Sequence, residues 1–263
     1  MFELSVLAAI LYLLVSLLFW LRERFPAPPW LLHLLLAAAV VSHTLGLQQA
    51  VWQSGGLDLG LFKVLSVLGL ILAVLVLFNQ LQRGAVNLGA WLLPVCAATA
   101  VLGVAVSGQY EIRSLSFSLT VHVLFALLAY AMFTVTLVYA LVVKAQERAL
   151  KHHHLSTLVK RLPPLQSMER TQFKLAWVAF ILLTLAMIIG YVALESFLGQ
   201  QVAHKTLLTA LAWGLFAGLF IGHHVWGWRA VMTLRGLLAG YFLLSLGFIG
   251  PKVVLEFILG NGV

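Results

Sequence analysis

The chain has 263 residues, of which 62% are hydrophobic and only 9% charged, and its mean hydropathy is +1.04. Globular domains are about half apolar and a quarter charged, so this composition excludes a water-soluble protein and indicates a polytopic membrane protein. A single cysteine, Cys96, excludes a disulfide within the chain and a thiol pair for redox chemistry.

A hydropathy window of about 20 residues predicts eight membrane-spanning helices. They lie near residues 3–21, 30–47, 61–79, 86–106, 116–143, 173–194, 205–226 and 236–258. The predicted fold is all-α: a polytopic integral membrane helix bundle of about eight transmembrane helices, forming a single transmembrane domain over residues 1–263. We expect the first span to be retained, because it lacks a basic start and a small-residue cleavage site. The one long polar connection is 144–171.

The basic residues predict the orientation of these spans, because Lys and Arg are retained on the cytoplasmic side of a membrane. Twelve of the 16 fall at one set of alternate span ends and four at the other. The twelve are Arg22, Arg24, Arg83, Lys144, Arg148, Lys151, Lys160, Arg161, Arg170, Lys174, Arg229 and Arg235, and the four are Lys63, Arg113, Lys205 and Lys252. Both termini are therefore expected on the outer side. Topology also explains most of the net charge of +8, so we expect no nucleic-acid partner.

Histidines inside the apolar stretches are the main functional candidates, because a titratable side chain in hydrocarbon is costly unless it is hydrogen-bonded or metal-bound. His43, His122 and His204 are predicted near the outer ends of the second, fifth and seventh spans. His223 lies nineteen positions after His204, which on a helix is about 28 Å deeper, at the cytoplasmic end.

Two interpretations of these histidines follow from the residues alone. A lone membrane histidine most often hydrogen-bonds a carbonyl or hydroxyl group of another span. Three histidines at similar depth also suit haem, since imidazole is a common axial ligand of haem iron.

Small side chains surround two of the candidates. A stripe with helical spacing contains His122 among Ser118, Ala126 and Ala129, and such a face accepts either a neighbouring helix or a flat porphyrin. In the seventh span a small residue recurs every fourth position, which predicts a helix contact. These residues are Ala210, Gly214, Gly218 and Gly222.

Four segments together resemble the CcsA/HemX-like cytochrome c assembly family, and in particular its short, YpjD-like bacterial inner-membrane branch. They are Val121–Tyr130, Ser167–Arg170, His204–Thr206 with Ala212–Trp213, and Gly222–His223 with Gly227–Arg229. The resemblance covers nearly the whole chain. It implies an eight-helix membrane fold in the bacterial inner membrane, with binding or movement of non-covalent, b-type haem and a role in c-type cytochrome biogenesis.

The resemblance also implies candidate residues and partners. The cofactor-binding candidates are His43, His122, His204 and His223, with His43 and His122 as axial ligands of haem iron. Expected partners are the lipid bilayer, haem, and cytochrome c maturation proteins or another membrane subunit. Complete haem lyases of the family carry an outer tryptophan-rich segment, whereas residues 194–201 here contain no tryptophan. We therefore expect that this chain is not a complete haem lyase.

No catalytic signature accompanies these features: the sequence has no nucleophile elbow, phosphate loop or cysteine-rich metal site. It also lacks Cys-x-x-Cys-His, so the chain is not itself a c-type cytochrome. We expect haem handling rather than an enzyme. The alternatives are a small-molecule or proton-coupled transporter, in which the histidines line a path, and a non-catalytic membrane scaffold.

Overall fold

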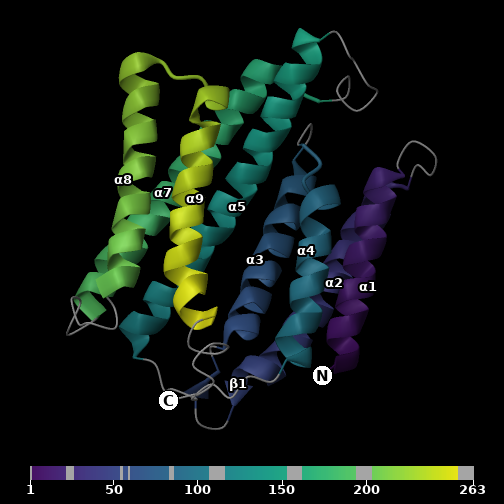
Figure 1. Ribbon diagram of the computed structural model, residues 1–263. Coiled ribbons are helices and arrows are strands. Elements are labelled where there is room, and N and C mark those ends of the chain that lie inside the picture. Colours follow the sequence, from purple (N-terminus) through teal and green to yellow (C-terminus); the bar gives the residue numbers. More distant parts are fainter. Residues whose placement is uncertain are drawn as a thin grey trace. The chain divides into compact units, whose positions relative to one another are not determined.

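The fold is an all-α arrangement of apolar helices (Figure 1). The computed structural model describes residues 2–21, 27–53, 56–58, 60–82, 86–106, 116–152, 162–193 and 203–253. These residues contain eight helices, of which seven are long and apolar enough to cross a membrane, and the eighth is a shorter apolar helix of 17 residues. The predicted polytopic helical membrane protein is confirmed.

The helices form two compact units. Unit 1 comprises Met1–Leu115 with Lys252–Val263, and unit 2 comprises Ser116–Pro251. Each is described by itself. The single transmembrane domain over 1–263 stays a prediction.

Unit 1 is built on four helices and one short strand pair. They are α1 (Phe2–Trp20), α2 (Pro29–Val51), β1 (Trp52–Gln53), β2 (Gly56–Leu57), α3 (Leu61–Leu81) and α4 (Gly89–Ala105). The strands pair antiparallel between α2 and α3. α1 packs against α2 and α4, and α3 packs against the same two helices (Figure 1).

Close packing in unit 1 depends on small side chains. A Cβ at Gly103 of α4 would lie 2.4 Å from the Cβ of Ser66 on α3, so only glycine fits there. A Cβ at Gly69 would similarly meet the Thr99 side chain. Small residues at such positions let membrane helices approach closely.

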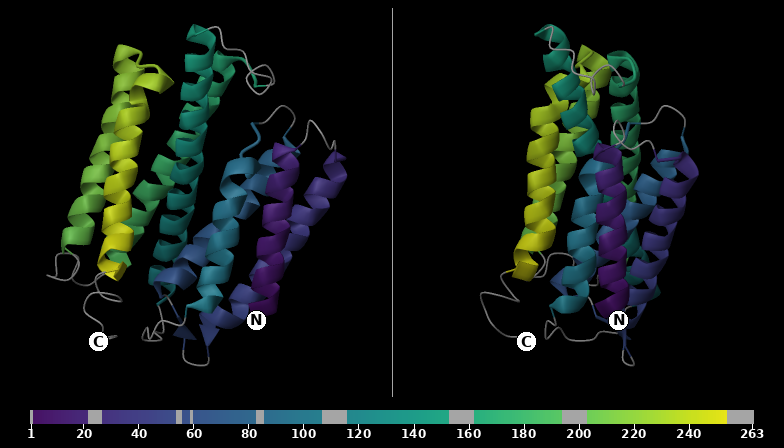
Figure 2. Two further views of the ribbon diagram at one scale, coloured as in Figure 1. Left: turned by 45° about the vertical axis from the view of Figure 1, so that its right-hand side comes forward. Right: turned by 90° about the vertical axis from the view of Figure 1, so that its right-hand side faces the viewer.

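Unit 2 contains α5 (Phe117–Lys151), α7 (Leu165–Ala193), α8 (Ala203–Trp226) and α9 (Ala230–Val253). Successive helices run in opposite directions (Figure 2). α7 presents a buried stripe to α5, with residues three or four apart, as interlocking helices require. Its members are Met168, Gln172, Ala176, Ala179, Leu183, Ala186 and Gly190.

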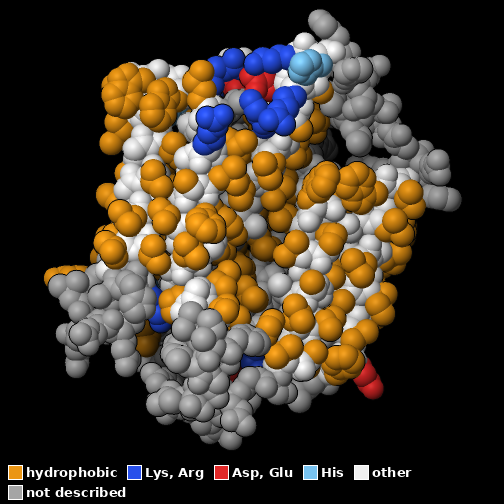
Figure 3. Space-filling view, in the orientation of Figure 1, with side chains coloured by type: hydrophobic (Ala, Val, Ile, Leu, Met, Phe, Trp, Pro, Cys, Tyr) orange, Lys and Arg blue, Asp and Glu red, His pale blue; other side chains and the backbone are white. Residues whose placement is uncertain are grey.

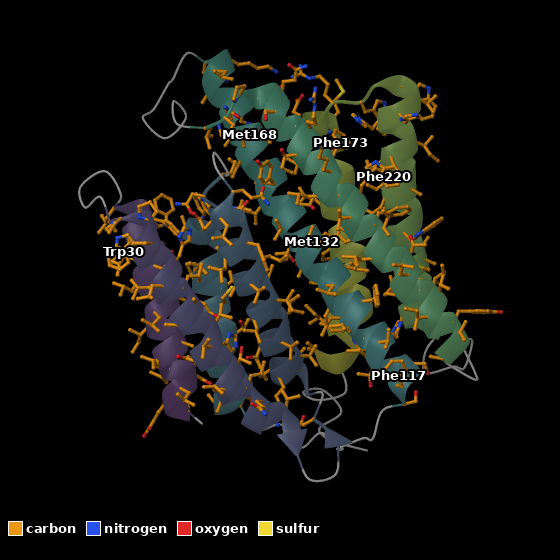
Figure 4. The ribbon with its side chains drawn as sticks, turned by 180° about the vertical axis from the view of Figure 1, so that it is seen from behind. Trp30, Phe117, Met132, Met168, Phe173 and Phe220 are labelled. Carbon is orange, nitrogen blue, oxygen red and sulfur yellow. The ribbon has the colours of Figure 1, made fainter. Side chains whose placement is uncertain are left out.

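Stacked rings join α7 to α8. Three pairs follow one another along the two helices, with centroid separations of 3.6, 4.3 and 5.4 Å. The pairs are Phe173 with His223, Trp177 with Phe220, and Phe180 with Trp213. Figure 4 shows Phe173 and Phe220 on these neighbouring helices. Stacked aromatic pairs contribute about 0.5–1.5 kcal/mol each beyond burial.

The predicted helix contact through the glycines of α8 is wrong at its two middle positions. No described atom lies within 4 Å of where a Cβ would be at Gly214 or Gly218. Contact with α9 runs the other way: Gly236 and Gly240 of α9 are closely approached by side chains of α8. A regular spacing of small residues in one helix does not tell which of two packed helices supplies the small residues at their contact.

Two helices extend well beyond the predicted spans. α5 continues to Lys151 instead of ending near 143, and α7 begins at Leu165 instead of 173. The extension of α5 is polar, and a hydropathy window does not register it. Glu147 pairs with Lys144 at 3.0 Å and with Lys151 at 3.1 Å, and such i,i+3 and i,i+4 pairs favour helix outside the hydrocarbon.

Large apolar side chains cover the outside of the helices (Figure 3). Ile10 of α1 is 57% exposed, Ile188 of α7 56% and Ile221 of α8 54%. Isolated exposed apolar residues are normal in soluble proteins, but continuous apolar surfaces on every long helix are not. Such surfaces are expected of helices that contact lipid.

Candidate functional site

His122 lies in the second turn of α5, close to where that helix begins. Ser116 caps the helix, because its hydroxyl accepts a hydrogen bond from the backbone N–H of Leu119 at 3.3 Å. An N-capped start fixes the helical register of the residues that follow. His122 therefore has a defined position on the face that packs against α7.

The ring of His122 is oriented by α7. Its Nδ1 lies 2.7 Å from the carbonyl oxygen of Ala186. A carbonyl can only accept, so Nδ1 carries the proton and donates it. In the neutral imidazole Nε2 is then the unprotonated nitrogen, and no hydrogen-bond partner of Nε2 occurs among the residues described.

Gly190 provides the space for this ring. It lies one turn after Ala186 on the buried stripe of α7. A Cβ at position 190 would be 2.7 Å from both Cε1 and Nδ1 of His122, closer than any van der Waals contact. The pair Ala186 and Gly190 thus forms the seat of the imidazole, which we call the His122 seat.

These residues fit an axial haem ligand. Metal-bound histidines usually donate their other ring N–H to a carbonyl or carboxylate, which fixes the tautomer and the ring plane. His122 has this arrangement, with a carbonyl at Nδ1 and no partner of Nε2 among the described residues. The side chain is part-buried rather than sealed in the core.

His43 has a different environment, in unit 1. Its side chain is 1% exposed, and both ring nitrogens face hydroxyl groups. Nε2 lies 2.9 Å from the hydroxyl of Ser66 on α3, and Nδ1 lies 3.3 Å from the hydroxyl of Tyr12 on α1. His43 thus joins α1, α2 and α3, as the packing interpretation expects. Its assignment as an axial ligand stays a prediction, and ligation through Nε2 requires Ser66 to give way.

The other two candidates lie at opposite ends of α8. His204 is the second residue of that helix, and its side chain lies outside the described residues. α8 begins at the same end of unit 2 at which α5 begins (Figure 1). His223 is at the far end, where its Nδ1 donates to the carbonyl of Trp228 at 2.6 Å and its ring stacks on Phe173.

The turn that holds His223 is tightly closed. Gly227 has a φ of +64°, a left-handed conformation that suits glycine. The ring of Trp228 lies over Gly222, where a Cβ would be 2.3 Å from it. These contacts give His223 a structural part in the α8–α9 turn.

Two further points concern the connection 194–201 and metal binding by clusters of side chains. The outer connection 194–201, which lacks the tryptophan-rich segment, is not described. Across the described ranges, no three His, Cys, Asp or Glu side chains come together as ligands of a bare metal ion.

Sequence reasoning did not identify the His122 seat or the hydroxyl partners of His43. The sequence did contain a signal for the His122 seat. Ala186 and Gly190 are small residues one turn apart in a span, and such pairs mark close helix approach. Tyr12 and Ser66 gave no signal, because their meeting with His43 depends on how three helices pack.

The fold and the histidines define a polytopic helical membrane protein in which one histidine, His122, is held by the carbonyl of a neighbouring helix. The family model described as cytochrome C assembly protein matches residues 30–259. The chain belongs to this cytochrome c assembly family.

Two relatives illustrate the likeness. Inner membrane protein YpjD of Escherichia coli (strain K12) is 27% identical over 227 residues, which cover 84% of each chain. An "Uncharacterized 28.8 kDa protein in nifR3-like 5'region" of Azospirillum brasilense is 33% identical over 141 residues, 53% of this chain and 52% of that protein. No solved structure is significantly similar to the chain.

Proposed function

We propose that this protein binds haem non-covalently in the bacterial inner membrane and handles it during c-type cytochrome biogenesis, without being a complete haem lyase. Membership of the cytochrome c assembly family supports a role in c-type cytochrome biogenesis. The printed name of the Escherichia coli relative, an inner membrane protein, supports the location.

The observation that carries the proposal is the His122 seat. The Ala186 carbonyl oxygen lies 2.7 Å from Nδ1 and accepts its proton in a hydrogen bond, and Gly190 leaves room for the ring. In its neutral form His122 would therefore direct the unprotonated Nε2 to haem iron and keep its hydrogen bond to Ala186. Haem would supply the redox-active iron and the porphyrin plane, and the chain would supply the ligand, its orientation and an apolar surrounding.

A second ligand would complete six-coordinate iron. His43 is the predicted partner, and its ligation through Nε2 would replace the 2.9 Å contact with Ser66. His204 is the other candidate, because its helix begins at the same end of unit 2 as His122. His223 would serve the α8–α9 turn rather than the iron, since its Nδ1 and ring face are both engaged.

The missing tryptophan segment supports a role short of covalent attachment. A lyase has to hold haem beside the thiols of an apocytochrome, and residues 194–201 offer no indole to stack on the macrocycle. A carrier, a reservoir or an accessory subunit needs only reversible binding.

Absorption spectroscopy of the purified protein, titrated with haemin, tests the proposal. We expect a Soret band for the wild type. His122→Ala should remove this band or convert it to the spectrum of haem iron with one axial ligand fewer. His224→Ala is the matched control, since His224 is exposed at the end of α8. His43→Ala and His204→Ala identify the second ligand. An unchanged spectrum in His122→Ala would refute the role of the His122 seat.

Free imidazole provides a second readout. If truncation leaves a space beside the iron, added imidazole should restore part of the lost spectrum in His122→Ala. A variant that has merely unfolded would not recover.

A further inference from the structure

Basic side chains gather at the end of unit 2 where α5 ends and α9 begins (Figure 3). A cavity of about 510 Å³ opens there. Its lining combines three cationic side chains with two apolar ones: Lys144, Arg148, Met232, Leu234 and Arg235.

The described acidic side chains at this end pair with two lysines and with Arg229, and of these partners only Lys144 lines the cavity. Glu147 pairs with Lys144 and Lys151, at 3.0 and 3.1 Å, and Glu169 of α7 pairs with Arg229 at 3.2 Å.

The two arginines of the cavity have no acidic partner in the described ranges. Among the described residues, neither Arg148 nor Arg235 forms an ion pair, and both are exposed. Within the part of the chain that the structure describes, the cavity therefore presents two guanidinium groups without an acidic partner.

The length of α5 places the cavity at the boundary of the membrane. Lys144 lies 27 residues after Phe117, which on a helix is about 40 Å, whereas the hydrocarbon core is about 30 Å thick. A helix that begins at one face of that core carries Lys144 beyond the other face, to the level of the lipid headgroups. Met232, 68% exposed, adds an apolar surface beside the cations.

A phosphate attached to acyl chains matches this combination. Guanidinium groups bind phosphate oxygens in a fork geometry with charge-assisted hydrogen bonds. Basic pockets between membrane helices at the headgroup level suit anionic lipids. We propose that the cavity binds the phosphate of an anionic phospholipid, with Arg148 and Arg235 as the principal contacts and the acyl chains along Met232 and Leu234. This site is independent of the proposed haem function.

Thermal unfolding of the full-length protein in neutral detergent tests the site. Phosphatidylglycerol is added to one sample and phosphatidylcholine, at the same mole fraction, to another. We expect phosphatidylglycerol alone to raise the unfolding midpoint, by several degrees, and R148Q/R235Q to lose most of that rise. R170Q/K174Q is the matched control, since it removes two exposed cations of α7 that do not line the cavity.

Three outcomes would overturn the proposal. The first is an equal rise with both lipids, and the second is an equal loss of the rise in the two double variants. The third is full protection by inorganic phosphate or haemin without any by phosphatidylglycerol, which would assign the cavity to a free anion or to haem propionates.

A measurement that needs no variant keeps the test decisive if R148Q/R235Q does not fold. Native mass spectrometry of the wild-type protein, exposed to both lipids together, should retain phosphatidylglycerol in preference to phosphatidylcholine. Retention of the two lipids in equal amounts would refute the site.

Discussion

Gly190 of α7 lies directly against the imidazole of His122 on α5. A Cβ at position 190 would come within 2.7 Å of two ring atoms, while the Ala186 carbonyl holds the same ring through Nδ1. The ring cannot yield to a larger neighbour without losing that hydrogen bond. Gly190 thus sets where Nε2 lies, although it has no side chain to contact a ligand.

Gly190→Ala should weaken haemin binding at least about tenfold, equivalent to about 1.4 kcal/mol, because the added methyl displaces the His122 ring. Titration monitored at the Soret band measures the effect. Gly214→Ala is the control, since that position of α8 has open space around it among the described atoms.

Equal haemin affinity in Gly190→Ala and the wild type would show that the iron is not held through the His122 seat. A similar loss in Gly214→Ala would instead assign the effect to the general consequence of replacing a helical glycine.

Ser66→Ala should lower the free energy of unfolding by about 1 kcal/mol, because it leaves Nε2 of the buried His43 without its hydroxyl partner. Denaturant or thermal unfolding in detergent measures this. Thr44→Ala is the comparison, since among the described residues the exposed Thr44 hydroxyl bonds to the Val40 carbonyl of its own helix alone. Equal stabilities of the two variants would count against His43 as a structural link.

The same Ser66→Ala variant bears on the ligand question. If His43 binds iron through Nε2, removing the competing hydroxyl should leave haemin affinity unchanged or raise it. A loss of haem that matches His43→Ala would contradict ligation through that nitrogen.

Reporter fusions test the orientation that the twelve-to-four charge distribution predicts. A fusion after Lys160 should report the cytoplasm, and a fusion after Val263 should report the outer side. If both fusions report one side, the eight-span orientation is wrong.

Haem handling and haem attachment can be separated in a host stripped of its own maturation system. Expressed there as the only added factor, this chain should yield no haem-stained c-type cytochrome, because residues 194–201 lack the haem-presenting tryptophans. Covalent holocytochrome above the empty-vector control would show that the connection suffices without them.

Much of the fold was predictable because each span carries its own signal. About twenty apolar residues identify a membrane helix without knowledge of its neighbours, so all eight helices were expected near their observed places. The ends of α5 and α7 were not, since there the helix is stabilised by ion pairs and packing rather than by lipid.

The candidate site was predictable only as far as single helices specify it. Sequence gives the helix that carries His122 and its nearness to the helix start, and the structure agrees. It does not give the tautomer, which depends on the Ala186 carbonyl 64 positions later. Nor does it separate His43 from His122, because the hydroxyls that engage His43 come from two other helices.

α4, which the sequence predicts to cross the membrane, is shorter than the hydrocarbon layer. Its 17 residues span about 26 Å, against a hydrocarbon thickness of about 30 Å. The backbone that precedes α4 is not helical, and its polar groups need hydrogen-bond partners wherever lipid surrounds them. One partner is the Asn79 side-chain amide, which donates to the Val86 carbonyl at 2.7 Å. If α4 spans the membrane, we expect a helix this short to draw the adjacent bilayer thinner. Unit 1 should therefore be more stable in lipids with shorter acyl chains, which makes membrane thickness a variable that acts on this protein directly.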